Sequence, residues 1–322
     1  MLGNTPSLAD AKPTACPKLV QEYSLAFIIM FFDFLRYKKL YFIFSGVLIS
    51  ASIVCLAIFG LNLGIDFTGG SIMELEYQGD RPSIEKVKES LESELGAVYV
   101  QTSGQNGLLI RMQDITEEAH QEILQILNEG YQTEELRFES IGPTIGQELK
   151  DKTKILIIVA LASIVLYIAF AFRKVQRPIK SWQYGLASFI ALFHDALIPM
   201  GVFSLLGKFY GVQITVPVVA ALLTVLGYSI NNTVVVFDRV RENLIRGEGA
   251  TFAETVNKSI NQTLTRCLNT ALTTLLVLSA IFFFGGSTLK YFSLVLIIGI
   301  TAGTYSSIFL ANPILTRFSK NA

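Results

Sequence analysis

Charged side chains are scarce in this sequence. Lys, Arg, Asp and Glu account for 16% of its 322 residues, whereas soluble domains average about 25%. The mean hydropathy of +0.49 agrees with this shortage. Because 26 basic residues balance 26 acidic ones, the total charge gives no sign of a nucleic-acid partner, and we expect none. The composition is typical of a membrane protein rather than a soluble domain.

Cysteine and histidine are also rare, with three and two residues respectively. The polar stretch from residue 66 to residue 150 has no cysteine at all. The spacing of these residues allows neither a disulfide framework nor a metal site, so we expect no metal and no cofactor. Cys55 and Cys267 fall in or beside apolar runs, and we interpret them as small apolar side chains.

Long apolar runs are what the sequence has in abundance. A transmembrane helix needs about 20 mostly apolar residues. Six stretches meet this requirement, at residues 40–63, 155–172, 184–206, 214–237, 268–284 and 291–310. Taken together, they are too many to be the buried core helices of a soluble protein. We therefore predict an α-helical multi-pass membrane protein with six transmembrane helices.

Lys and Arg gather in alternate connections, and this sets the orientation because cytoplasmic loops carry an excess of them. The basic flanks hold Arg36, Lys38, Lys39, Arg173, Lys174, Arg177, Lys180, Arg239, Arg241, Arg246, Lys258, Arg266, Arg317 and Lys320. The other connections hold few by comparison, namely Lys208 and Lys290. We predict a protein of the plasma (inner) membrane with both termini in the cytoplasm.

These spans divide the chain into a cytoplasmic amino-terminal segment, a first transmembrane helix, a domain outside the cytoplasm, transmembrane helices 2–6 and a cytoplasmic tail. The corresponding residues are 1–39, 40–63, 64–152, 153–318 and 319–322. Residues 24–35 are apolar but too few to span, so we predict an interfacial helix there. The polar residues before them do not have the pattern of a signal peptide.

The outside domain is acidic, since residues 66–150 hold seventeen Asp and Glu but six Lys and Arg. Such a charge does not favour anionic lipid or nucleic acid as a partner. A well-solvated surface is the simpler interpretation, and a basic protein partner is the alternative.

The apolar periodicity of this domain changes in a regular order. Strands are expected at 71–77, 97–102, 108–112 and 136–141, with a turn at 104–107 between the middle two. One helix begins at Pro82 and Ser83 and runs to about Leu95, and Thr116 caps another. The order β-α-β-β-α-β predicts an α+β ferredoxin-like domain with both helices on one face of the sheet. The other face would be free for binding.

A glycine-rich segment, Gly64-Ile-Asp-Phe-Thr-Gly-Gly70, follows the first span. It lacks the GK[ST] ending and the following helix that a phosphate-binding loop requires. We interpret Gly64, Gly69 and Gly70 as a tight turn at the membrane surface, because glycine permits positive φ. Asp66 would cap or hydrogen-bond within that turn.

A second joint precedes the second span. Gly142, Pro143 and Gly146 restrict or free the backbone at fixed places, which is typical of a hinge. A domain that swings and a domain that merely docks would both need such a joint, so the sequence leaves the two open.

Asp195 is the one carboxyl deep inside a predicted span. A carboxylate in hydrocarbon is costly, so such a residue faces a polar interior and marks a functional site. A carboxyl group that takes up and releases protons suits a proton carrier. His194 could share its proton network, although neighbours on a helix point about 100° apart. A structural hydrogen bond to a facing helix is the alternative.

Polar residues also interrupt the fourth and fifth spans. Residues 227–233, which include Ser229, form a polar belt in the fourth span. Its residues Asn231, Asn232 and Thr233 could carry protons or could join helices by hydrogen bonds. Arg266, near the start of the fifth span, would either anchor at the headgroups or point toward that belt.

Several motifs together resemble one family. They are GIDFTGG, IGPTIGQEL, LFHD, LLTVLGYSINNTVVVFDRVREN and SINQTLTRCLNTALTTLL, in this order over roughly residues 31–318. They resemble the SecD/SecF family of bacterial protein export, and within it the smaller SecF-type subunit, which is similar to resistance-nodulation-division transporters. The resemblance implies a subunit that works with SecD and the SecYEG channel on a translocating preprotein. It also implies the proton motive force as the driving force, without nucleotide or metal.

One residue departs from the family pattern. The family usually has Asn-Asp where this chain has Asn231-Asn232, and the resemblance identifies that Asp as a proton-binding carboxyl. An amide does not titrate near neutral pH. Asp195 or a carboxyl of SecD could carry the proton alone, the driving ion could differ, or the chain could be uncoupled. Arg266 corresponds to the family's arginine and is retained.

Two other functions remain open at this stage. One is a small-molecule or lipid exporter of the same superfamily, and the other is a structural translocase scaffold without proton coupling. We expect no enzyme, because no nucleophile, base and orienting group cluster in the outside domain.

Overall fold

The computed structural model describes residues 32–319 apart from 80, 129–130 and 174–177. Most of the predicted interfacial helix at 24–35, and the basic residues Lys174, Arg177 and Lys320, lie outside this part. The described chain begins with a 3-10 turn, η2 (Phe34–Tyr37), which Asp33 caps by accepting a hydrogen bond from the Arg36 N–H.

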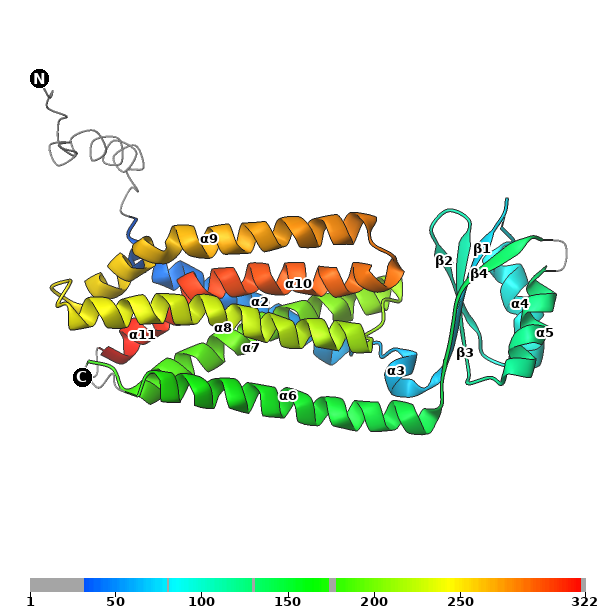
Figure 1. The fold of residues 1–322 in the computed structure, drawn as a ribbon, viewed down its shortest axis with the longest axis horizontal. Coiled ribbons are helices and arrows are strands. Elements are labelled where there is room, and N and C mark those ends of the chain that lie inside the picture. Colours follow the sequence, from blue (N-terminus) through cyan, green and yellow to red (C-terminus); the bar gives the residue numbers. More distant parts are fainter. Residues whose placement is uncertain (1–31, 80, 129–130, 174–177, 320–322) are drawn as a thin grey trace, which may run out of the picture.

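The described chain holds six helices that are long and apolar enough to cross a membrane, which confirms the predicted fold class. They form a bundle with a small domain at one end, and the start of α2 and the end of α11 lie at the opposite end (Figure 1). The helices are α2 (Lys38–Phe59), α6 (Pro143–Ala171), α7 (Ser181–Tyr210), α8 (Val216–Ile245), α9 (Phe252–Phe284) and α10 (Ser287–Ser306), which continues through η3 (Ser307–Ala311) into α11 (Asn312–Phe318).

Most of the helices extend beyond the predicted apolar stretches, and two of the ends that differ have an evident local reason. The first helix ends at Phe59, not at residue 63, because Gly60 adopts a positive φ of 67° that ends the helix. The fifth helix begins at Phe252, well before residue 268, because Thr251 caps it by accepting a hydrogen bond from the Glu254 N–H. Polar residues can be helical outside the apolar run that hydropathy detects.

The sixth membrane helix changes its pitch in the middle. η3 is a π-helical turn that ends at Ala311, directly before Asn312 and Pro313 at the start of α11. Proline has no N–H for the ordinary helical hydrogen bond. Within the same segment, the Asn312 side chain donates to the Ser307 carbonyl at 2.5 Å. Such π turns are frequent at functional sites.

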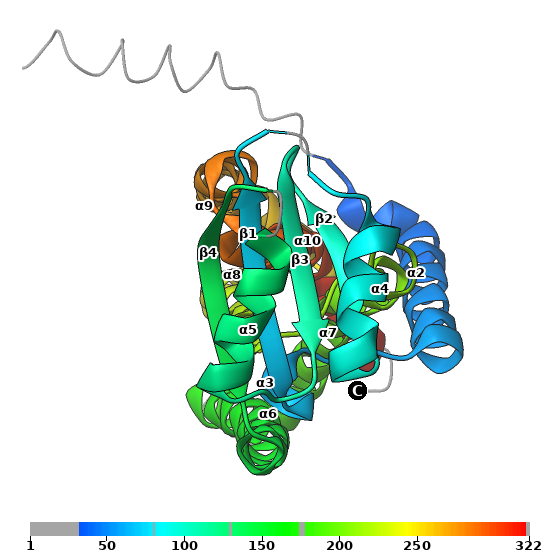
Figure 2. The ribbon, with the colours of Figure 1, turned by 90° about the vertical axis from the view of Figure 1, so that its right-hand side faces the viewer.

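The small domain has the predicted ferredoxin-like order. Its elements are α3 (Ile65–Thr68), β1 (Gly70–Tyr77), α4 (Ile84–Leu95), β2 (Tyr99–Ser103), β3 (Gly107–Met112), α5 (Glu117–Asn128) and β4 (Thr133–Ile141). The strands form an antiparallel sheet in the order β2-β3-β1-β4. Figure 2 shows α4 and α5 on one face of it, where Met73, Leu75, Leu91, Leu108 and Ile110 form the core.

The other face of the sheet is not simply free, as the sequence suggested. It looks toward the end of the bundle (Figure 1), and Ile72 and Glu74 on it are buried. A cavity of about 710 Å³ separates this face from the ends of α7, α8 and α10. The sheet therefore stands over the membrane helices without filling the space between them.

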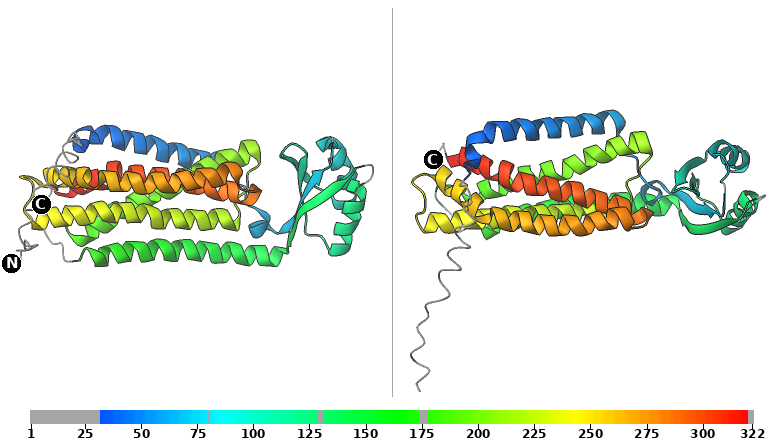
Figure 3. Two further views of the ribbon diagram at one scale, coloured as in Figure 1. Left: turned by 45° about the horizontal axis from the view of Figure 1, so that its top comes forward. Right: turned by 90° about the horizontal axis from the view of Figure 1, so that it is seen from above.

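Within the bundle, α10 is central and packs against α7, α8 and α9. α6 lies at the edge of the bundle and leads straight from β4 of the domain toward the far end (Figure 3). This arrangement brings α7, α8 and α10 together around one buried carboxyl group.

Candidate functional site

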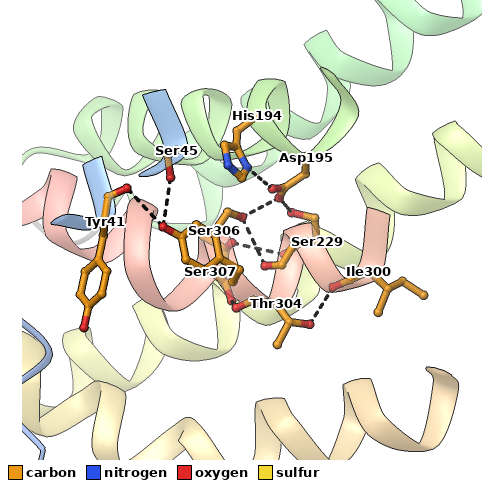
Figure 4. Close-up of polar contacts among 12 residues, drawn as sticks. Tyr41, Ser45, His194, Asp195, Ser229, Ile300, Thr304, Ser306 and Ser307 are labelled. Atoms are coloured by element: carbon orange, nitrogen blue, oxygen red, sulfur yellow. Dashed lines mark hydrogen bonds and ion pairs between the residues drawn. The ribbon is translucent and has the colours of Figure 1, made fainter. Parts of the chain in front are cut away.

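Asp195 of α7 lies fully buried in the interior of the bundle. Figure 4 shows its carboxyl group at the meeting point of α7, α8 and α10. Each of these helices contributes at least one polar side chain to it. The predicted intramembrane carboxyl therefore faces a polar interior made by its own chain.

Three hydrogen bonds surround the Asp195 carboxyl. His194 Nδ1 lies 2.8 Å from Oδ1, while Ser229 Oγ and Ser306 Oγ lie 2.5 Å and 2.6 Å from Oδ2. A carboxylate only accepts hydrogen bonds, so all three groups donate to its ionised form. Ser306 Oγ also lies 3.2 Å from the Gly303 carbonyl. The Gly303 carbonyl is therefore a second acceptor within reach of the same hydroxyl.

Glycines on α10 allow the two serines to come this close. A Cβ on Gly303 would lie 2.9 Å from the Cβ of Ser229, and a Cβ on Gly299 would collide with Val225. Small residues at helix contacts permit such close approach in membrane bundles. The short distance between α8 and α10 is therefore a condition for the carboxyl site.

His194 extends the polar site toward α2. Its Nε2 is buried without a hydrogen-bond partner in the described chain, and its ring stacks on Tyr305 with a centroid distance of 6.0 Å. The Tyr305 hydroxyl donates to the Tyr41 carbonyl at 3.2 Å and accepts from Ser45 Oγ at 3.3 Å. Polar groups thus continue from Asp195 to α2 (Figure 4).

Asn232 lies on the same α8–α10 contact but is not bonded to the carboxyl. It is buried, and its Nδ2 donates to Thr304 Oγ1 at 3.4 Å. Thr304 in turn donates to the Ile300 carbonyl at 2.8 Å. Within the part of the chain that the structure describes, no hydrogen bond joins Asn232 to Asp195. This amide therefore joins the same two helices through a hydrogen bond of its own.

Asn231 and Arg266 lie away from the carboxyl. Asn231 on α8 and Arg266 on α9 are both exposed on the outside of the bundle, and Asn269, one turn beyond Arg266, is exposed as well. The structure therefore brings Asp195 and His194 together but separates both from Arg266. Among the hydrogen bonds of the described residues, none joins Arg266 to Asp195 or His194.

The glycine-rich segment after the first span contains the short helix α3 (Ile65–Thr68) rather than a plain turn. Gly64 donates its N–H to the Ile214 carbonyl at 2.8 Å. Asp66 does not cap its own turn, because its Oδ2 accepts a hydrogen bond from the Val216 N–H at 2.8 Å. The segment is thereby bonded to the start of α8.

The glycines at the two joints stand where backbones nearly touch. A Cβ on Gly69 would lie 2.8 Å from Pro143 Cα, and a Cβ on Gly146 would lie 2.8 Å from the Gly69 nitrogen. Gly69 and Gly70 also have positive φ values of 76° and 123°. Gly142 precedes Pro143 as the N-cap of α6. The two joints therefore pack on each other.

Sequence reasoning missed Ser306 and treated Ser229 only as part of the polar belt. A signal for Ser306 was present, because Gly-Thr-Tyr-Ser-Ser at 303–307 gathers small and polar residues inside an apolar span. Which of these hydroxyls meets Asp195 depends on packing between distant helices. Among the described residues, no group of three or more His, Cys, Asp and Glu side chains is placed to hold a metal ion.

Comparison with known proteins identifies relatives that match about nine tenths of the chain. Residues 121–321 match the family described as protein export membrane protein SecD/SecF, C-terminal, and residues 56–80 match the SecD/SecF GG motif. A protein translocase subunit SecF from Thermobaculum terrenum is 41% identical over 301 residues, which are 89% of this chain and 93% of the relative. A protein translocase subunit SecF from Rhodothermus marinus is 40% identical over 90% of this chain and 94% of the relative.

Two solved structures are similar as well. The crystal structure of SecDF, a translocon-associated membrane protein from Thermus thermophilus, superposes with a TM-score of 0.79 at 34% identity. SecDF in its super-membrane-facing form gives a TM-score of 0.64 at 33% identity. Each comparison covers 90% of this chain but 39% of the SecDF chain, so this chain spans about two fifths of that longer protein.

Proposed function

Because this chain belongs to the SecD/SecF family of protein export membrane proteins, we infer that it is an accessory subunit of the Sec protein-export translocase. We further propose that Asp195 takes up and releases the protons that drive its part of export. The observation that carries this proposal is the fully buried carboxyl held by His194, Ser229 and Ser306.

Protonation of Asp195 would change how two helices are held. Ser229 on α8 and Ser306 on α10 both donate to the same oxygen, Oδ2. A proton on that oxygen leaves room for one donor fewer, because a protonated carboxyl oxygen donates as well as accepts. Hydrogen bonds to charged groups contribute about 1.5–3 kcal/mol, so this exchange is large enough to bias the α8–α10 contact.

The helix α8 connects that site with the outside domain. Ser229 lies thirteen residues after Val216, which is about 20 Å along a helix that rises about 1.5 Å per residue. Val216 is hydrogen-bonded to Asp66 in the joint before β1. A small displacement of α8 would therefore move the joint at which the domain is attached. Proton-driven work on a polypeptide requires such a connection between the membrane site and the outside domain.

SecD is the partner that we propose for the exposed polar surface of α8 and α9. Arg266, Asn231 and Asn269 lie on the outside of the bundle, on two helices that pack against each other. A charged side chain that faces lipid is costly unless it reaches the headgroups or pairs with a neighbouring group. A neighbouring subunit that offers a carboxylate would remove this cost, and the SecDF relative combines a region like this chain with a longer one.

The SecD contact can be tested by co-purification. We expect Arg266→Ala to weaken recovery of SecD with this chain, and Arg266→Lys to retain most of it because the positive charge remains. Arg246→Ala, which removes an exposed arginine at the C-cap of α8, serves as the matched control. Equal recovery of SecD with Arg266→Ala and with Arg246→Ala would contradict the proposed contact.

We propose further that the chain lies in the plasma membrane with its termini in the cytoplasm and its domain outside. The start of α2 and the end of α11 lie on the side of the bundle opposite the domain. Basic residues gather at that side. In this position the acidic domain would meet the SecYEG channel exit and the emerging preprotein. The test uses two single-cysteine variants, Glu89→Cys and Lys258→Cys, and an impermeant thiol reagent added to intact cells. The reagent should modify the cysteine at position 89 and leave the one at position 258 unmodified.

The proton-carrier role is tested by export itself. In cells that depend on this chain with its SecD, pulse-chase labelling should show that Asp195→Asn slows the maturation of secreted precursors several-fold. Asp238→Asn is the matched control, because Asp238 is an exposed carboxyl on the same bundle. A structural scaffold without proton coupling also fits a fully bonded Asp195, and unchanged export with Asp195→Asn would favour it.

A further inference from the structure

The sheet of the outside domain is attached to the membrane helices along one side. β1 follows α3, β4 leads into α6, and these two strands are neighbours in the order β2-β3-β1-β4. Figure 2 shows β4 and β2 as opposite edges of the sheet. The covalent joints therefore hold one side of the sheet, and β2 is the edge farthest from them.

At that far edge, a side chain of the sheet reaches the bundle. Gln101 on β2 donates a hydrogen bond from Nε2 to the carbonyl of Tyr210, the last residue of α7, at 3.2 Å. Its Oε1 accepts a hydrogen bond from Arg111 Nη1 at 2.8 Å. Because Arg111 can only donate, it orients the amide so that the nitrogen of Gln101 faces Tyr210. Burial lowers the pKa of Arg111 from its ordinary value, as expected for a guanidinium placed under the sheet.

The turn that receives Gln101 is shaped for this contact. Gly211 adopts a left-handed conformation with a φ of 63° at the end of α7. A Cβ on Gly211 would collide with the amide nitrogen of Gln101. The Gly211 carbonyl is itself held by Asn62 Nδ2 at 3.4 Å. Glycine at 211 thus serves both the turn and the approach of the sheet edge.

The contact is also weak enough to open. The Gln101 hydrogen bond is exposed to solvent, and a single bond of this kind shifts an equilibrium by about two- to tenfold. Behind it lies the cavity of about 710 Å³ between sheet and bundle, so little packing resists separation at this edge. The opposite edge has the closely packed glycine joints at Gly69 and Gly146.

We propose that Gln101 is a positioning residue that latches the outside domain onto the α7–α8 turn, and that the domain pivots about the joints at Gly69 and Gly146 when the latch opens. The turn connects α7, which carries Asp195, with α8, which carries Ser229. A movement of either of the two helices that hold the Asp195 carboxyl would therefore shift the turn to which Gln101 is bonded. Only this last link rests on the proposed function; the latch itself rests on the contacts of Gln101.

The test uses Gln101→Glu, which keeps the shape of the side chain and its contact with Arg111. The variant has no N–H for the Tyr210 carbonyl and places an oxygen against it instead. Gln105→Glu is the matched control, because it makes the same charge change at an exposed position in the turn that joins β2 and β3. Gly211→Ala disrupts the same contact from the α7–α8 turn, because its Cβ would displace the Gln101 amide.

Pulsed electron paramagnetic resonance would measure the distance between spin labels at Glu89 on α4 and Lys208 on α7, in full-length chain with its native cysteines replaced by Ala and reconstituted with SecD. Gln101→Glu and Gly211→Ala should each increase a second, displaced distance population by about two- to tenfold, and Gln105→Glu should match the parent. If both variants give the parent distribution, the latch does not exist. A changed distribution together with normal export by Asp195→Asn would keep the latch and remove the proton role.

Discussion

The carboxylate of Asp66 accepts a hydrogen bond from the backbone N–H of Val216 at 2.8 Å, although 150 positions separate the two residues. The first N–H groups of a helix have no partner within the helix. Thr215, the N-cap of α8, makes no side-chain hydrogen bond to them. Asp66 therefore supplies the cap of α8 from the joint of the outside domain.

We expect Asp66→Ala to lower the free energy of unfolding by about 1 kcal/mol, the usual cost of losing an N-cap. Hydrogen exchange should show a faster-exchanging amide at Val216 in this variant. Asp66→Asn is the control, because its side-chain oxygen can still accept the hydrogen bond. An unchanged Val216 exchange rate in Asp66→Ala would show that the cap has no stabilising role.

Gly69→Ala should destabilise the chain more than Gly60→Ala. Both positions have a positive φ, 76° and 67° respectively, so alanine is strained at either one. A Cβ at Gly69 also lies 2.8 Å from Pro143 Cα, whereas a Cβ at Gly60 meets nothing within 4 Å. Overpacking typically costs about 1–3 kcal/mol. Thermal unfolding in detergent would measure the difference, and equal midpoints would contradict the close contact of the two joints.

Ser306→Ala should lower the free energy of unfolding by about 1.5–3 kcal/mol, because a buried carboxylate loses a donor. The neighbouring Ser307→Ala is a matched control, since Ser307 is equally buried but donates to the Thr304 carbonyl. Its loss should cost about 0.5–1.5 kcal/mol. Chemical unfolding of both variants in the same detergent provides the comparison. A smaller effect at Ser306 than at Ser307 would contradict a stabilising hydrogen bond from Ser306 to Asp195.

Asn232→Asp should leave the fold intact and keep or increase proton-dependent export. The Thr304 hydroxyl, which now accepts from Asn232 and donates to the Ile300 carbonyl, can turn and donate to a carboxylate instead. Asn232→Leu should fold less well, because it leaves the buried Thr304 hydroxyl without this partner. Pulse-chase export and yield of folded protein would measure both effects. Loss of export in well-folded Asn232→Asp would mean that the chain depends on the amide.

The sequence was sufficient for those features that depend on local pattern. The spans followed from hydropathy, the ferredoxin-like order followed from alternating periodicities, and Asp195 stood out because carboxyl groups inside apolar spans are rare. Two observed helix ends differ from the predicted ones because Gly60 ends α2 and Thr251 caps α9. Hydropathy does not measure either effect. These features need only a few neighbouring residues.

The contacts that make the site depend on distant parts of the chain. Ser306 meets Asp195 across 111 positions, and Gln101 meets Tyr210 across 109. One sequence contains no periodicity or spacing that selects such partners among many similar serines and glutamines. The partner of Asp66 was wrongly predicted for the same reason, since a cap within its own turn is the local choice.

Proton flux through reconstituted vesicles tests the central claim most directly. Liposomes that contain this chain together with its SecD, and a pH-sensitive dye inside, would be exposed to a proton gradient. The account predicts that Asp195→Asn reduces the flux several-fold relative to the parent, while Asp238→Asn leaves it unchanged. Equal flux in the parent and in Asp195→Asn would contradict a proton-carrying role for the buried carboxyl.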